Sequence, residues 1–409
     1  MKTVPLRSVA TVLVSNVDKK SVDGDRPVRL CNYTDVYYNR KLDQTREYMQ
    51  ATASWDQVRS FRLREGDTVI TKDSETATDI GVPALIAASA SDFVCGYHLA
   101  IVRPGPRIDS RYLNWQMNSP SIRDQLTAWA TGVTRHGLTY AAINSVDLSL
   151  PPMDEQRRIA NFLDDQVARL DAAWLEAQDS GRLIAARFQA SVDVLFDGSG
   201  RTIPLKALLE RFPQYGVLVP ILVDRGVPFI RIKDLSRLAS CDAASLTAIP
   251  AVQSVEYRRT VVKAGDVLIG VVGSTDKAAV VPEQLAGANI ARAVARLVPR
   301  PEVPSDVLLG WLSTTVYRHQ VATVTDADTA QPTLNMSDLR NFRVALPDRS
   351  LPALAASVQD VCEERRSLAE RTNGLVRVLH ERKQALITAC VTGEFDVSTA
   401  SLRARCAAL

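Results

Sequence analysis

Residue types that serve in catalysis occur throughout this 409-residue sequence, but not at the spacings that common reactions require. The sequence lacks a GxxxxGK[ST] phosphate loop, an HExxH motif, a GxSxG nucleophile turn and a GxGxxG loop after a strand. The nearest approach to a phosphate loop, Gly270–Thr275, has neither the lysine nor the following helix. The four histidines, His98, His136, His319 and His380, are scattered. We therefore predict a binding protein with no catalytic residue, metal or cofactor of its own.

Two long stretches, Pro152–Phe196 and Leu351–Cys390, are each predicted to form one helix. Their apolar residues recur at alternating steps of four and three, which is the spacing of a coiled-coil seam. A helix of about 40 residues is about 60 Å long, more than a compact domain needs for its own core. The alternative is two ordinary amphipathic helices on separate domains, but the matching seams favour pairing. The predicted seam residues are Leu163, Leu170, Trp174, Ile184, Phe188, Leu368, Leu375, Leu379 and Leu386.

The chain also repeats itself. Arg64–Ile70 matches Lys263–Ile269 at an offset of 199 residues, and Trp115 matches Trp311 at an offset of 196. Between such matched points the two copies diverge. The pattern indicates a tandem duplication in which a shared frame carries different surfaces.

Each copy is predicted to be an α+β domain followed by one long helix. Short β-type runs such as Pro27–Leu30 and Phe229–Ile232 precede a Gly-Asp turn into a buried strand, and helical stretches follow around Tyr112–Gln125 and Val307–Gln320. The predicted boundaries are domains at 1–151 and 199–347, long helices at 152–198 and 348–393, and a tail at 394–409.

Composition is that of an ordinary globular protein, with 46% hydrophobic and 23% charged residues. A net charge of +3 barely favours polyanions. The N-terminus lacks the features of a signal peptide, and apolar runs are too short for a membrane span. The six cysteines lie far apart with no CxxC pair. We expect a cytoplasmic protein with reduced thiols and no membrane contact.

Several segments in a fixed order carry a family resemblance. They are the Gly-Asp turns, the domain-closing segment Leu138–Pro152, the helix start Asp154–Ile159 and the ending Leu386–Phe395. This arrangement resembles the DNA-specificity subunit of Type I restriction-modification enzymes over nearly the full length. In one departure, Asp348–Ala353 replaces the expected Glu-Gln-Arg start of the second helix, which leaves open whether both helices meet their partners alike.

The resemblance implies that each globular domain is a target recognition domain reading one half of a split, asymmetric site in double-stranded DNA. The long helices are then expected to pack antiparallel, as a spacer and as the docking site for two methyltransferase subunits. S-adenosylmethionine would be bound by those subunits, and ATP and Mg by the motor-nuclease subunits. The implied role of the chain is antiviral restriction-modification and DNA methylation, to which it contributes no catalysis.

Candidate DNA-binding residues are polar, basic and aromatic groups on the divergent loops, where side chains can reach phosphates or base edges. In the first domain they are Tyr33, Tyr37, Arg40, Lys41, Lys72, Ser74, Thr134, Arg135 and His136. In the second domain they are Arg231, Lys233, Ser274, Thr275, Lys277, Asn289, Arg292 and Gln331. Individually, any of these can instead be a solvated loop residue.

Two other functions compete with this interpretation. A stand-alone DNA-modifying nuclease or methyltransferase requires an acidic metal cluster or a glycine-rich cofactor motif. The second is a coiled-coil scaffold without a DNA role, which does not explain why the two globular domains differ in sequence.

Overall fold

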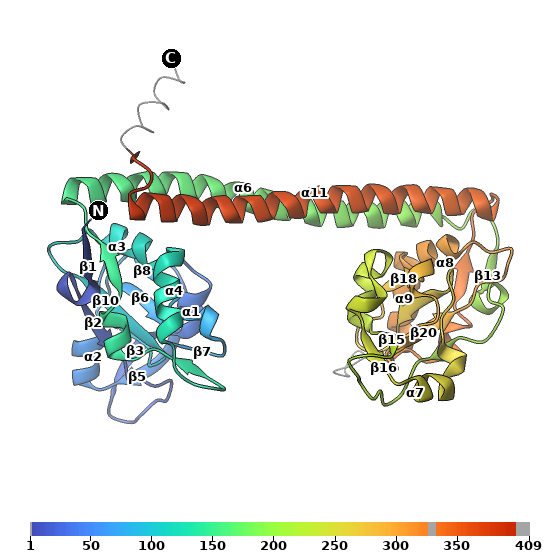
Figure 1. Ribbon diagram of the computed structural model, residues 1–409, viewed down its shortest axis with the longest axis horizontal. Helices are drawn as coiled ribbons and strands as arrows, with labels where there is room; N and C mark the ends of the chain where they lie inside the picture. Colours follow the sequence, from blue (N-terminus) through green and yellow to red (C-terminus); the bar gives the residue numbers. More distant parts are fainter. Residues whose placement is uncertain (1, 326–332, 398–409) are drawn as a thin grey trace, which may run out of the picture. The chain divides into compact units, whose positions relative to one another are not determined.

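The computed structural model describes residues 2–325 and 333–397. The chain divides into two compact units. The first unit combines residues up to 177 with those from 375 onward, and the second comprises 178–374. Each unit contains one α+β globular part and one half of each long helix (Figure 1). The predicted α+β class with duplicated globular parts and two long helices is confirmed.

The globular part of the first unit is built on two sheets. The larger has the order β2 (Ala10–Val14), β10 (Leu99–Pro104), β6 (Thr68–Thr71), β8 (Pro83–Ile86) and β4 (Lys41–Leu42). The smaller has the order β5 (Met49–Ala53), β3 (Arg26–Cys31) and β9 (Phe93–Cys95). Two short ladders pair β1 (Thr3–Pro5) with β12 (Asp147–Ser149) and β7 (Asp73–Ser74) with β11 (His136–Gly137). The helices are α1 (Tyr33–Tyr37), α2 (Trp55–Phe61), α3 (Ser110–Met117), α4 (Pro120–Trp129) and α5 (Tyr140–Asn144).

The second unit repeats this plan with shorter strands. Its larger sheet has the order β14 (Gln214–Tyr215), β20 (Val294–Leu297), β17 (Val267–Gly270) and β18 (Ala278–Val280). Its smaller sheet has the order β16 (Thr247–Ile249), β15 (Val227–Ile230) and β19 (Asn289–Ile290). A ladder pairs β13 (Thr202–Pro204) with β21 (Arg343–Ala345). The helices are α7 (Ala251–Glu256), α8 (Ser305–Leu312), α9 (Thr315–Val324) and α10 (Met336–Leu339). Short 3-10 helices of both units are η1 (Leu6–Ser8), η2 (Ala77–Asp79), η3 (Leu205–Ala207), η4 (Ile232–Ser240), η5 (Ala243–Ser245), η6 (Arg258–Thr260) and η7 (Glu283–Leu285).

The Gly-Asp turn makes the same contacts in both units. Gly66 and Gly265 have φ angles of 86° and 84°, a conformation that glycine adopts without strain. The following carboxylates are buried, and each is paired with an arginine: Asp67 with Arg103 at 2.7 Å and Asp266 with Arg296 at 2.6 Å. Because an unpaired buried charge is strongly unfavourable, the arginine is needed at each turn.

Each helical stretch predicted before the long helices is in fact two helices. The first breaks between α3 and α4 because Pro120 begins α4, where its fixed φ and missing N–H suit the first turn. The second breaks between α8 and α9, where the hydroxyl of Thr314 caps α9 by accepting from the Tyr317 N–H.

The long helices are α6 (Met153–Leu195, 43 residues) and α11 (Leu351–Thr392, 42 residues), within a few residues of the prediction. They run side by side (Figure 1), and their contacts are antiparallel within each unit. In the first unit Asp171 pairs with Lys383 at 2.6 Å, while Phe162 stacks on Phe395. In the second unit the guanidinium of Arg365 lies 4.4 Å from the ring centre of Phe188.

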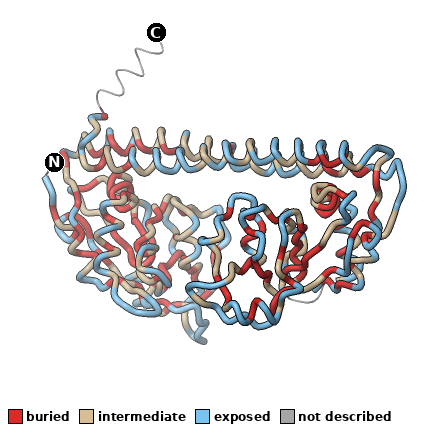
Figure 2. The backbone as a smooth tube through the Cα atoms, turned by 45° about the vertical axis from the view of Figure 1, so that its right-hand side comes forward, coloured by how far each residue is buried: buried red, intermediate tan, exposed pale blue. Residues whose placement is uncertain are grey.

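Each globular part is joined to the helices by polar contacts, which are partly buried in the first unit and exposed in the second. In the first unit, the Gln156 side chain accepts a hydrogen bond from Asp109 N–H (2.8 Å) and donates to the carbonyl of Pro151 (2.9 Å). In the second unit, the carboxylate of Asp193 accepts hydrogen bonds from the N–H and hydroxyl of Thr315, the first residue of α9. Figure 2 shows buried residues gathered in the globular parts and toward the helix ends, whereas the middle of each helix is mostly intermediate or exposed.

Candidate nucleic-acid interface

A protruding hairpin in the first unit presents several of the predicted DNA-binding residues. Thr131 and Gly137 exchange backbone hydrogen bonds of 3.1 and 2.8 Å, which close the exposed turn carrying Thr134 and Arg135. The β11 strand then pairs with β7, and this places His136 opposite Ser74. The turn is therefore held at its base by backbone pairing while its side chains face outward.

Beside this hairpin, basic groups surround one carboxylate. Asp73 accepts from Lys72 Nζ and from His98 Nδ1, each at 2.8 Å. Arg135 Nη2 lies 3.4 Å from both ring nitrogens of His98, so the guanidinium lies against the imidazole. Burial alone would raise the pKa of Asp73, but the hydrogen bonds from Lys72 and His98 outweigh burial and lower it. With two lysine or arginine cations against one carboxylate, this cluster is suited to bind a phosphate or a base edge.

Tyrosines extend the surface from α1. Tyr33 stacks on Tyr37 with ring centres 5.4 Å apart, and Tyr38 is 75% exposed. The Tyr37 hydroxyl donates to Asp79 at 2.6 Å, and this bond raises the pKa of Tyr37 to about 12. Burial raises the pKa of Tyr33, and the neighbouring Ser74 side chain partly opposes this. The structure thus brings Tyr33, Tyr37, Lys72, Ser74, Thr134, Arg135 and His136 together.

Arg40 lies apart from this cluster. Its guanidinium lies 4.7 Å from the ring centre of Trp115 and 3.2 Å from the carboxylate of Asp171 in α6. With Lys41 and Trp115 it lines a cavity of about 260 Å³ between the globular part and α6. Arg40 therefore serves to join the globular part to α6, and Lys41 is exposed on β4 next to it.

The predicted residues of the second unit are spread more widely. Lys233 and Arg292 are exposed, while Arg231, Ser274, Thr275 and Lys277 are half-buried. The expectation that Asn289 lies on an accessible loop is wrong. Asn289 is fully buried, and its amide bonds to Ser254 and Thr260. Gln331 lies outside the described residues.

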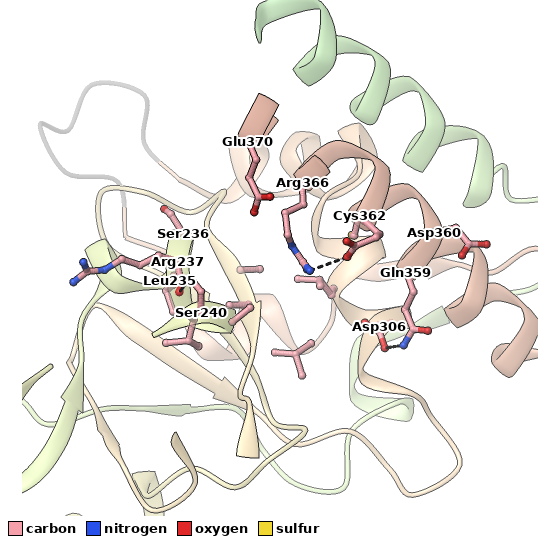
Figure 3. A pocket seen from close by; sticks show the side chains of 17 residues that line it. Leu235, Ser236, Arg237, Ser240, Asp306, Gln359, Asp360, Cys362, Arg366 and Glu370 are labelled. Carbon is pink, nitrogen blue, oxygen red and sulfur yellow. Dashed lines mark hydrogen bonds and ion pairs between the residues drawn. The ribbon is translucent and has the colours of Figure 1, made fainter. Parts of the chain in front are cut away.

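A cleft of about 850 Å³ separates η4 and β18 from α11 in the second unit. Figure 3 shows Gln359 donating to Asp306 along its helical side. Arg366 on the same helix pairs with Glu363 at 2.7 Å. In the first unit the cavity lined by Arg40 and Lys41 occupies the corresponding place and is smaller, because Arg40 extends across it.

The predicted seam residues are buried to different degrees. Leu163 is fully buried, and Leu375 is 50% exposed. The others are half-buried: Leu170, Trp174, Ile184, Phe188, Leu368, Leu379 and Leu386. Leu170, Trp174 and Leu379 line a cavity of about 260 Å³ in the first unit.

Sequence reasoning missed Tyr97, Asp73 and His98. The Tyr97 and His98 rings lie 3.5 Å apart, and both follow β9 directly. Their only sequence signal is a histidine and an acid next to predicted strand ends, which is too common to single them out.

The fold is that of a tandem α+β protein organised on a pair of antiparallel helices. In the part of the chain that the structure describes, no helix is long and apolar enough to cross a membrane, and no group of three His, Cys, Asp or Glu residues could hold a metal.

No family model matches the sequence. The chain is similar to the specificity subunit of the Type I restriction enzyme EcoBI from Escherichia coli, with 25% identity over 305 residues. The match covers 67% of this chain and 64% of that subunit, just under two thirds of the relative's length. The resemblance to Type I specificity subunits is thus confirmed by a curated relative.

Two solved structures are similar to this chain. One, described as "Structural basis underlying complex assembly and conformational transition of the type I R-M system", matches with a TM-score of 0.60 and 17% identity. That match covers 95% of this chain and 97% of the other. The HsdS subunit of Thermoanaerobacter tengcongensis matches with a TM-score of 0.49 and 18% identity, over 96% and 97% of the two chains.

Proposed function

We propose that this protein is the DNA-specificity subunit of a Type I restriction-modification complex. Each globular part reads one half of a bipartite, asymmetric site in double-stranded DNA. The observation that carries the proposal is the duplication, in which one frame with the same Gly-Asp turn carries two different surfaces. Two surfaces that differ on a common frame are what two different half-sites require. The similarity to the EcoBI specificity subunit supports the same function.

In the first unit, the hairpin and the basic cluster form the reading surface. Arg135 is exposed on a turn whose base is held by backbone pairing, so little conformational entropy is lost when it contacts DNA. Lys72 and His98 are fixed by Asp73 and supply further donors. The stacked tyrosines add flat, rigid contact area beside them.

The helices dock two methyltransferase subunits, and motor-nuclease subunits complete the complex. S-adenosylmethionine, ATP and Mg belong to those partners. Exposed apolar side chains in the middle of the helices support a docking role: Leu175, Leu183, Leu375 and Val378 are each at least half exposed. Where exposed apolar side chains form one patch, they mark a surface that a partner covers.

A domain exchange tests the proposal. Residues 1–151 are replaced by the equivalent part of a relative with a different target, and methylated adenines are mapped in cells carrying the hybrid. One half of the recognised sequence should change while the other stays intact. The reciprocal exchange of 199–347 is the matched control and should change only the other half. If either exchange altered both halves, the two parts would not read DNA independently.

A further inference from the structure

The second unit carries a group of exposed apolar side chains that the predicted DNA-binding residues do not include. Six aliphatic side chains on one loop and on α7 are each more than half exposed: Leu218, Val219, Ile221, Leu222, Val252 and Val255. Contiguous apolar surface on this scale marks a binding site more often than isolated exposed residues do.

This surface is held in a fixed conformation. The Gln253 side chain of α7 accepts from Ile221 N–H and donates to the Val219 carbonyl, each at 3.0 Å. Gln253 itself is buried. At its far end the loop pairs with the β16 strand through Val223. A buried glutamine thus binds the loop backbone to α7 and leaves the apolar side chains facing solvent.

The first unit has the same backbone arrangement with different side chains. Val17 pairs with Gly96 and accepts from Tyr97 N–H at 2.9 Å, just as Val217 pairs with Ala291 and accepts from Arg292 N–H at 2.9 Å. The loop after Val17 begins Asp-Lys-Lys-Ser, whereas the loop after Val217 begins Leu-Val-Pro-Ile. The apolar surface is therefore particular to the second unit.

Two features indicate what this surface contacts: its position beside Arg292 and the difference in sequence between the two loops. Its loop leaves the sheet beside Arg292, the counterpart of Tyr97, and Tyr97 lies next to His98 in the basic cluster of the first unit. On the proposed function, both units dock the same kind of methyltransferase but read different half-sites. A surface that differs between the copies is therefore a reading surface.

We propose that this apolar surface reads thymine 5-methyl groups in the major groove of the half-site bound by the second unit. The thymine methyl is the apolar group that base pairs present in that groove, and aliphatic side chains recognise it by contact. The inference rests on the proposed function, and it predicts A·T pairs in the second half-site.

Uracil in place of thymine tests the proposal, because it removes the methyl and leaves base pairing unchanged. The full chain with its methyltransferase subunits selects duplexes from random pools made with thymine or with uracil. Kd is then measured on matched duplexes. Each contacted methyl should contribute about fourfold in Kd to the wild type. Ile221→Ser, which leaves no methyl group on this side chain, should bind thymine and uracil duplexes equally at the contacted position. The control is Val316→Ser on α9, where an exposed valine is replaced, and it should retain the wild-type difference.

The outcomes separate the possibilities. A second half-site without A·T pairs, or wild-type binding unaffected by uracil, overturns the inference while leaving sequence-specific binding intact. If Ile221→Ser instead loses a partner subunit on a sizing column but keeps its uracil sensitivity, the surface binds protein. If no sequence is enriched from either pool, the proposed function itself fails.

Discussion

Replacing Gln156 with leucine should weaken the attachment of the first globular part to α6. The Gln156 side chain is buried, and its amide bonds to the Asp109 N–H and to the carbonyls of Pro151 and Arg107. Leucine has a similar volume but no polar atoms. It leaves the Asp109 N–H and the buried Pro151 carbonyl without partners.

The magnitude follows from these orphaned groups. A buried donor or acceptor left unsatisfied costs roughly 1–3 kcal/mol, and the Arg107 carbonyl is on an exposed residue where water can replace the amide. With two such groups, the unfolding free energy of the first unit should therefore fall by roughly 2–6 kcal/mol, a large share of the 5–15 kcal/mol typical of a domain.

Urea unfolding followed by tryptophan fluorescence measures this loss. Trp55, Trp115, Trp129 and Trp174 all lie in the first unit, so the signal reports mainly on it. Gln166→Leu is the matched control on the same helix, since the Gln166 amide bonds only to an exposed aspartate. Equal stability of the two variants would refute the reasoning.

Three further predictions concern the reading turn, the helix pair and acid stability. Arg135→Ala should either relax specificity at one position of the first half-site or weaken binding to all sequences alike and lower the salt slope by about one unit. Salt titrations on cognate and mismatched duplexes distinguish these two results. Unchanged affinity, specificity and salt slope would show that Arg135 does not contact DNA. Trp174→Asp places a charge between the helices and should abolish methyltransferase docking on a sizing column; normal assembly would contradict the seam. Burial alone would raise the pKa of Asp193, but hydrogen bonds from Thr315 and Gln189 outweigh burial and lower it. The ionised Asp193 carboxylate therefore stabilises the folded protein above the unfolded-state pKa of about 3.9. This stabilisation is lost as the pH falls through the lower pKa of the folded state. Asp193→Asn should thus lower the urea midpoint at pH 7 more than at pH 3; an equal effect at both would show that the carboxylate charge is irrelevant.

The large elements of this fold are legible in the sequence because they rest on local patterns. The alternating four-three spacing locates both long helices, and repetition at a constant offset reveals the shared frame. The Gly-Asp turn is recognised because its glycine needs a positive φ.

The site was harder to predict because its contacts join distant parts of the chain. Arg40 follows two tyrosines and resembles a DNA contact, yet it packs on Trp115 and pairs with Asp171, which is 131 residues further on. Asn289 has a typical base-reading side chain, but its amide satisfies buried groups of the second unit. Residue type indicates what a side chain can bind. Tertiary packing decides whether its polar groups remain free for DNA or are already bonded inside the protein.

The contacts of Gln156 also bear on why recognition domains should be exchangeable at residue 151. Gln156 remains with α6 in such an exchange, and its partners in the globular part are backbone groups that any sequence supplies. Asp164 of α6 is different, because it accepts from the side chains of Arg111 and Trp115 at 3.0 and 2.9 Å. A hybrid whose incoming domain lacks this arginine and tryptophan should methylate DNA weakly despite an intact reading surface. Restoring the two residues in that domain should recover methylation, and a failure to do so would show that the Asp164 contact does not limit the exchange.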